Sequence, residues 1–106
     1  MNSFDLEAEF ADRAVPGTNG QLLLRTGDAL ALVESAERFR IPILGVDGLF
    51  VSPMHTVSPL EHIIDFSDHV AAGHGCWRQA ATFIESRREL GLVFDVVLGE
   101  ARATAG

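Results

Sequence analysis

The chain has 106 residues, of which 47% are hydrophobic, and its 15 acidic and 8 basic side chains give a formal net charge of −7. This length suits one domain with a modest core, and this hydrophobicity excludes a chain that is disordered throughout. The negative charge disfavours binding to nucleic acid and favours basic protein partners.

The first 20 residues combine an acidic segment with turn signals. Apolar and acidic residues alternate from Phe4 to Phe10, which is typical of a half-buried strand, whereas the Glu and Ala content suits a helix. Both interpretations stay open. Pro16-Gly17 and Asn19-Gly20 predict a loop over residues 13–20. We therefore expect one domain over residues 1–106, with residues 1–20 as a less ordered N-terminal arm.

A strand and a helix are expected next. The apolar run from Gln21 to Arg25 predicts a short strand, and apolar residues at helical spacing predict a helix from Asp28 to Phe39. Pro42 follows that helix. Ile43 to Val46, then Asp47-Gly48, then Leu49 to Ser52 predict a two-residue β-hairpin, because Asp-Gly accepts the positive φ angles of a type I′ turn.

The hairpin assignment has consequences for the side chains. It pairs Val46 with Leu49 on the core face and leaves Phe50 on the other face, where an aromatic ring can serve as a contact. Pro53 should end the hairpin, and we expect a loop from Pro53 to Pro59.

The second half of the chain carries two more strands and a helix. Ser58 and Pro59 have the pattern of a helix start, but the β-branched segment from His62 to Phe66 favours one turn followed by a strand. A loop over Ala71 to Gly75 precedes an amphipathic helix that begins near Trp77 and stops at Gly91. Leu92 to Leu98 reads as a strand in the sheet interior.

This order of elements predicts the fold class. Strands separated by two helices indicate an α+β domain, with a mixed, mostly antiparallel sheet of four to five strands and two helices packed on one face. A ferredoxin-like topology or a split βαβ variant is the nearest arrangement.

The compartment follows from general features of the chain. The acidic start lacks the basic segment and apolar run of a secretory signal. No stretch approaches the roughly 18 apolar residues that a membrane span needs. Cys76 is the only cysteine and cannot form an internal disulfide. We expect a cytoplasmic protein that does not bind membranes.

One segment carries several side chains that can do chemistry. Asp65, Asp68, His69, His74 and Cys76 lie within twelve residues, but their spacing matches no standard zinc motif. The thiol, near a helix start and a histidine, could act as a nucleophile, although free cysteine is more often a small apolar filler. We assign no catalytic residue, no metal ligand and no cofactor, and the chain has no dinucleotide or phosphate-binding loop.

A family resemblance adds a functional hypothesis. In size, in charge and in the segments Arg40 to Gly48 and Ile64 to Ser67, the sequence resembles small acidic bacterial immunity and antitoxin-type proteins. The resemblance implies a non-enzymatic inhibitor that covers the basic surface of a toxin, often a nuclease. It implies no particular functional residue.

Three functions therefore remain open from the sequence. The leading hypothesis is binding to a basic protein partner, with Asp47, Asp65 and Asp68 as steering charges and Phe50 as an anchor. The second is a small metal-binding or thiol-dependent enzyme domain that uses the loop from His69 to Cys76. The third is a structural domain that forms a homodimer or larger homo-oligomer.

Overall fold

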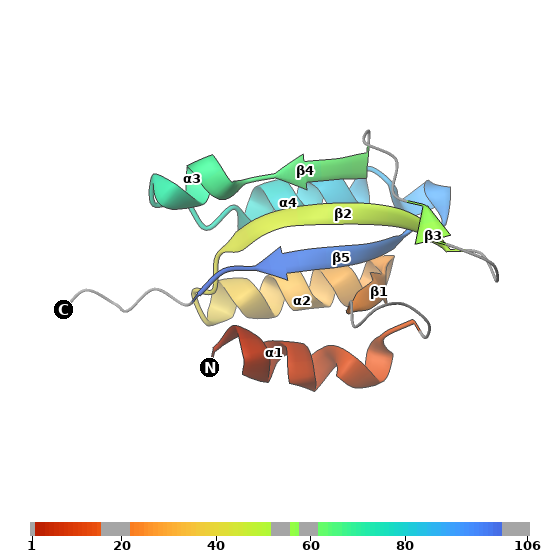
Figure 1. Ribbon diagram of the computed structural model, residues 1–106, viewed down its shortest axis with the longest axis horizontal. Coiled ribbons are helices and arrows are strands. Elements are labelled where there is room, and N and C mark those ends of the chain that lie inside the picture. Colours follow the sequence, from red (N-terminus) through yellow and green to blue (C-terminus); the bar gives the residue numbers. More distant parts are fainter. Residues whose placement is uncertain (1, 16–21, 52–55, 58–61, 101–106) are drawn as a thin grey trace.

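An antiparallel sheet forms the centre of the structure, which is a computed structural model that describes residues 2–15, 22–51, 56–57 and 62–100 (Figure 1). Helices pack against one face of the sheet, and single 3-10 turns link some of the elements. In chain order the elements are α1 (Ser3–Phe10), a 3-10 turn (Ala11–Arg13), β1 (Leu23–Arg25), α2 (Thr26–Arg38), β2 (Ile43–Val51), β3 (Thr56–Val57), β4 (Ile63–Asp65), α3 (Ser67–Ala71), α4 (Trp77–Glu85), a 3-10 turn (Arg88–Leu90) and β5 (Val93–Leu98).

The strand order interleaves the two halves of the chain. The sheet runs β1-β5-β2-β4, β3 pairs with the far end of β2, and each of these pairs is antiparallel. It follows that β1 and β2 are parallel with β5 between them, and that β4 and β5 are parallel with β2 between them. Two split βαβ units are thus interlocked, and the predicted α+β fold, in its split βαβ variant, is confirmed.

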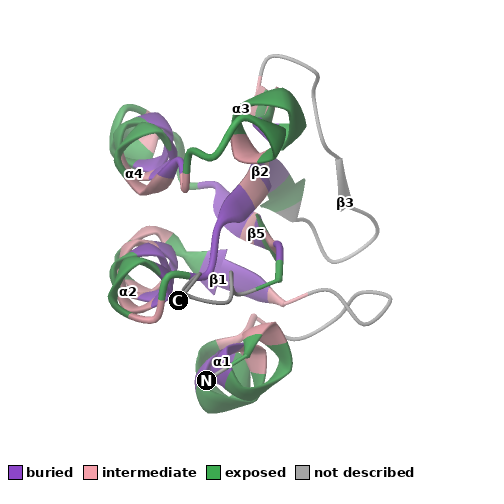
Figure 2. Ribbon diagram, turned by 90° about the vertical axis from the view of Figure 1, so that its left-hand side faces the viewer, coloured by how far each residue is buried: buried purple, intermediate pink, exposed green. Residues whose placement is uncertain are grey.

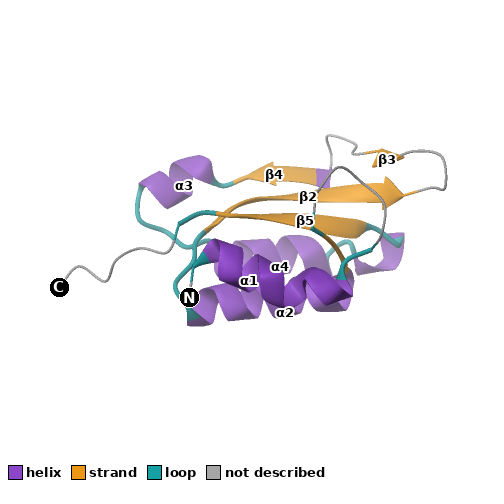
Figure 3. Cartoon of the chain, turned by 60° about the horizontal axis from the view of Figure 1, so that its bottom comes forward, coloured by secondary structure: helices purple, strands orange, loops and turns teal. Residues whose placement is uncertain are grey.

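The core lies between the sheet and the helices. Figure 2 shows α2 and α4 on one face of the sheet, and Figure 3 shows α1 on the same side, next to α2. Apolar residues at helical spacing explain this placement, since each helix turns one stripe inward. The buried helical side chains are Leu6, Phe10, Ala29, Leu32, Val33, Ala36, Ala80, Phe83 and Ile84.

The segment from Phe4 to Phe10 is helical. The helix α1 begins after Asn2, whose side-chain Oδ1 accepts a hydrogen bond from the Asp5 backbone N–H at 2.9 Å. Leu6 and Phe10, four residues apart, are both buried in the core. Of the two interpretations left open by the sequence, the helix is therefore the one that the structure adopts, and the apolar alternation is incidental.

The predicted hairpin at Asp47-Gly48 is wrong. Both residues lie inside one continuous strand, in which Asp47 pairs with Asp95 of β5 and with Ile63 of β4. A strand with partners on both sides gains ladder hydrogen bonds along its length, and this outweighs the local turn preference of Asp-Gly. Close packing explains the glycine, because a Cβ at Gly48 would lie 3.0 Å from Leu92 Cδ1.

Other predictions in this part of the chain have mixed outcomes. The strand near Ile63 is confirmed. Gly91 has the expected left-handed φ of 70°, but the helix that was predicted to reach it ends at Glu85, and Gly91 instead ends the 3-10 turn Arg88–Leu90. His69 lies in α3, which the sequence interpretation did not identify. The predicted turns within residues 16–20, most of the loop from Pro53 to Pro59 and the helix start at Ser58 lie outside the described residues.

The pairing of β2 with β4 leads to a stability prediction at Gly45. An added Cβ there would lie 2.6 Å from the Ile64 carbonyl oxygen, a backbone atom that cannot move without displacing β4. We expect Gly45→Ala to lower the free energy of unfolding by about 1–3 kcal/mol, as overpacking does. Urea denaturation of the variant and of the parent chain measures this difference.

Gly27→Ala is the matched control. Gly27 lies in the first turn of α2, and an added Cβ there meets nothing within 4 Å. Alanine should therefore be neutral or stabilise the protein by up to about 1 kcal/mol. Equal stabilities of the two variants would contradict the close approach of β4 to Gly45.

Candidate functional site

The sheet face that points away from α2 and α4, here called the outer face, divides into two regions. At one end, Leu23, Leu49 and Val93 form a small buried cluster against which Val15 packs. At the other end, strand alternation and register bring carboxylates and exposed aliphatic side chains together. In this second region, partly or fully exposed carboxylates lie beside exposed aliphatic side chains. The carboxylates are Asp47, Asp65 and Asp95, and the aliphatic residues are Ile63 and Val97.

A shallow hollow lies in this region. Its volume is about 240 Å³, and Gly45, which has no side chain, forms part of its surface where Val97 and Asp65 flank it in register. Ile63 and Val97 are 37% and 39% exposed, so the apolar part of the hollow is open to solvent. The lining residues are Leu44, Gly45, Asp47, Ile63, Ile64, Asp65, Ser67 and Val97.

Asp47 is a carboxylate in partly buried surroundings. It lies directly opposite Asp95 across the β2 and β5 pair. Partial burial raises the pKa of Asp47 above its ordinary value of 3.8. Within the described part of the chain, no hydrogen bond or ion pair reaches Asp47. A cationic group from a partner would therefore improve its environment.

Asp65 has a structural task as well as a place in the hollow. Its Oδ1 accepts hydrogen bonds from the Ser67 backbone N–H at 2.8 Å and from the Ser67 hydroxyl at 2.6 Å. These two bonds lower the pKa of Asp65 and hold the chain at the start of α3. Asp65 thus stays charged and is fixed in position at the rim of the hollow.

The four partner-binding residues expected from the sequence do not share one surface. Asp47 and Asp65 both line the hollow. Asp68 is exposed on α3 but does not line it. Phe50 is 41% exposed and, by strand alternation, lies on the helix-facing side of β2, where its ring meets the His62 ring edge-on at a centroid distance of 5.9 Å.

Ile63 and Val97 are the apolar residues that the sequence interpretation missed. The alternation from Leu92 to Leu98 did indicate that Val97 points away from the core, because Phe94 and Val96 both have the opposite phase and both are buried in the core. Ile63 carried no comparable signal, since its short strand gives too few positions to define a period. The wrong hairpin directed attention to Phe50 instead.

The segment from His69 to Cys76 begins inside α3, leads to the start of α4 and packs against the start of β2. Gly75 accepts a hydrogen bond at its carbonyl from the Ile43 N–H at 2.9 Å, and the Trp77 indole Nε1–H donates to the Ile41 carbonyl at 2.8 Å. A Cβ at Gly75 would collide with the Trp77 ring. These contacts give the segment a structural role in holding α4 against the sheet.

Cys76 is in poor surroundings for a nucleophile. It is 3% exposed and belongs to the core, and burial raises the pKa of its thiol. The His69 and His74 rings lie 6.4 Å apart at their centroids. Over residues 2–15, 22–51, 56–57 and 62–100, no group of three or more His, Cys, Asp or Glu side chains is arranged to hold a metal ion.

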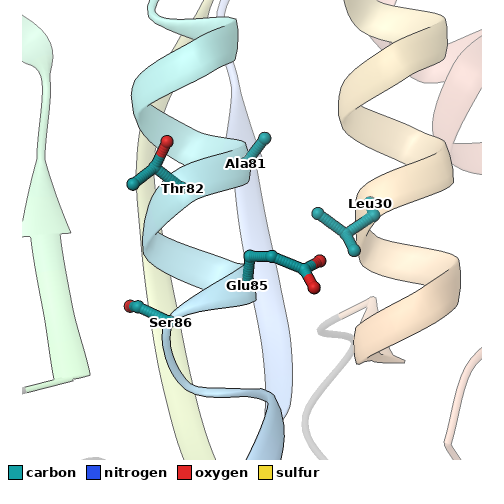
Figure 4. Close-up of a pocket in the computed structure, with 5 residues that line it drawn as sticks. All are labelled: Leu30, Ala81, Thr82, Glu85 and Ser86. Carbon is teal, nitrogen blue, oxygen red and sulfur yellow. The ribbon is translucent and has the colours of Figure 1, made fainter.

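A second hollow, of about 460 Å³, lies in the groove between α2 and α4 (Figure 4). Leu30 and Ala81 supply its apolar surface, with Thr82, Glu85 and Ser86 beside them. Glu85 is already engaged, because both of its oxygens accept hydrogen bonds from the Arg88 guanidinium at 2.8 Å. Glu85, the carboxylate of this hollow, is therefore less available to a basic partner than Asp47 is.

No protein-family model matches the chain, and no curated protein matches it. Among the described helices, none is long and apolar enough to cross a membrane.

The surroundings of Cys76 predict slow alkylation. We expect iodoacetamide at about pH 8 to modify the folded chain at least tenfold more slowly than the urea-unfolded chain, because the thiol is buried and its thiolate is disfavoured. Mass spectrometry of timed samples measures both rates. Equal rates would show that Cys76 is accessible and would reopen a thiol-dependent function.

The surroundings of Asp47 predict that its charge costs stability. A carboxyl whose pKa is raised by folding takes up a proton on folding, so stability falls as the pH rises from 3.8 through the folded-state pKa. We expect Asp47→Asn to stabilise the protein at pH 7 by less than about 1 kcal/mol, since solvent screens a partly exposed group. Denaturation at pH 7 and below the unfolded pKa tests this, because the gain should vanish at the lower pH.

Proposed function

We propose that the chain is a non-enzymatic protein-binding domain that covers a basic surface of its partner. The observation that carries the proposal is the joint placement of Asp47 and Asp65 with exposed Ile63 and Val97 around one hollow. Interfaces that bind specifically combine an apolar centre with charges at the rim, and complementary charge raises the encounter rate. The net charge of −7 extends the same preference over the whole molecule.

The partner class follows from the charge and from the family resemblance. A toxin that acts on nucleic acid needs a basic active surface, and an acidic domain that covers this surface would neutralise the toxin. We therefore propose a bacterial immunity or antitoxin-type role, with a nuclease toxin as the partner. Asp68 lies within three residues of Asp65 and remains a steering charge in this proposal.

Self-association through the outer face is less favourable than binding to a basic protein. Two copies meeting face to face would bring Asp47 and Asp65 of one copy close to the same carboxylates of the other. Each copy carries a formal charge of −7, which adds long-range repulsion. A homodimer would therefore have to use a different surface.

The proposal is tested by comparing baits that differ at the outer face. We expect the parent domain to capture a basic protein from lysate of the source organism, and D47N/D65N to capture about tenfold less of it. Asn at position 65 keeps an oxygen that accepts the Ser67 hydrogen bonds, so the start of α3 is preserved. Quantitative mass spectrometry of the eluates measures the difference.

The matched control is E9Q/D12N. It also removes two negative charges, but from exposed positions in α1 and in the turn that follows it. Capture by this variant should stay within about twofold of the parent. Raising the salt from about 0.1 M to 1 M shortens the screening length from about 10 Å to about 3 Å and should release the partner. Equal losses in both variants would refute the role of the outer face.

A further inference from the structure

The two edges of the sheet differ in whether their outward backbone N–H and C=O groups are hydrogen-bonded to other parts of the chain. At the β1 edge, the Val15 N–H donates a hydrogen bond to the Leu23 carbonyl at 2.7 Å, so the neighbouring chain already covers part of that edge. At the opposite edge lies β4, which pairs with β2 on one side only. β4 is therefore the sheet edge at which another strand could be added.

The register identifies which β4 groups point outward. The Phe66 N–H donates to the Leu44 carbonyl at 2.7 Å, and Ile64 is paired with Val46. Along an antiparallel ladder, hydrogen-bonded and non-hydrogen-bonded residue pairs alternate. Because Phe66 and Ile64 belong to the hydrogen-bonded pairs, the backbone N–H and C=O groups of Ile63 and Asp65 point away from β2. Within the described part of the chain, no hydrogen bond to these outward N–H and C=O groups is present.

The side chains beside this edge select the chemistry of an added strand. Ile63 and Asp65 are on the outer face, and residues paired with them would put their own side chains on the same face. A residue opposite Asp65 would lie about 5 Å away from it. Asp47 lies opposite Ile63 in β2, so it is diagonal to Asp65 and one strand further from the added segment. Arg or Lys fits the position opposite Asp65, because its cation can lie beside Asp65 and its long side chain can extend over Ile63 toward Asp47.

We propose that the partner docks by β-strand addition, in which an extended segment with basic residues at every second position pairs with β4 and lays them over the outer-face hollow. This inference rests on the proposed function and specifies the binding element of the partner. Backbone hydrogen bonds to Ile63 and Asp65 supply the docking geometry, while Asp65 and Asp47 supply the selection for a basic sequence.

A short peptide tests the mode of binding directly. The probe is an acetylated and amidated peptide in which Arg and Val alternate, titrated into the ¹⁵N-labelled intact domain. We expect saturable shifts of the Ile63, Asp65 and Val97 amide signals, and amide hydrogen exchange at Ile63 and Asp65 slowed at least about tenfold.

Two peptide controls separate the backbone contribution from the charge. The same peptide methylated on the backbone nitrogens of its Arg residues keeps its charge but cannot pair with β4, and it should bind at least about tenfold more weakly. The same peptide with citrulline in place of Arg keeps the backbone and loses the charge, and it should also bind more weakly. Equal affinity of the methylated and unmethylated peptides would overturn strand addition, as would the absence of saturable binding.

Domain variants complete the test. D65N should weaken the Arg peptide about threefold, whereas D12N, which removes a charge far along the chain from β4, should leave its affinity unchanged. Shifts centred on Leu30 and Ala81 in the helix groove would place the peptide elsewhere and overturn the inference. If the peptide fails while capture still depends on Asp47 and Asp65, strand addition is wrong and the proposed function stands. If capture also fails, the proposed function is wrong.

Discussion

The pairing of β2 with β5 is the interaction on which the rest of the structure depends. It runs from Ile43 opposite Leu98 to Leu49 opposite Val93 and fixes which side of each strand faces the helices. With Val46 and Val96 turned inward, Asp47 and Asp95 must turn outward, because successive side chains alternate. A shift of one residue would exchange the two sets and bury carboxylates in the core, so the hydrophobic pattern holds the register firmly.

The same constraint produces the charged outer face. Once the register is set, no local rearrangement can remove Asp47 from its position opposite Asp95. Partial burial raises the pKa of Asp47, so the charge of Asp47 lowers stability at neutral pH. Residues that lower stability are frequently retained for binding. Asp47 is partly buried beside exposed Ile63 and Val97. A cation from another protein would attract Asp47 more strongly at this surface than it would attract a carboxylate in water.

Elements with a regular spacing of apolar residues over a long segment could be predicted from the sequence. Elements whose structure depends on distant strand partners could not. Ala29, Leu32, Val33 and Ala36 identify α2 because the helical stripe is encoded in the spacing of a single segment. Asp47-Gly48 misled because its local turn preference is real, while the strand partners that override it, Asp95, Phe94 and Ile63, are distant in sequence. The apolar run from Leu92 to Leu98 did indicate an interior strand, and β5 is one, but the segment around Asp47-Gly48 carries no comparable signal of its central position.

The candidate site shows the same division. Asp47 and Asp65 were identified from the sequence as charges near strands, and the structure brings both to one hollow. Their neighbour Val97 arrives there through the β5 pairing with Gly45, which depends on long-range topology. The cluster from His69 to Cys76 looked chemical because ligand types are dense there, yet the fold uses Gly75, Cys76 and Trp77 to fasten α4 to the sheet.

The interleaved strand order also bears on how the protein is made. The last strand, β5, lies in the interior of the sheet between β1 and β2, so neither β1 nor β2 has that partner until residues 93–98 are available. During synthesis from the N-terminus, the helices can form early but the sheet cannot close until residues 93–98 have left the ribosome. A chain that stops before Val93 would lack the strand that joins β1 to the rest, and it would expose apolar strands to proteases and to other chains.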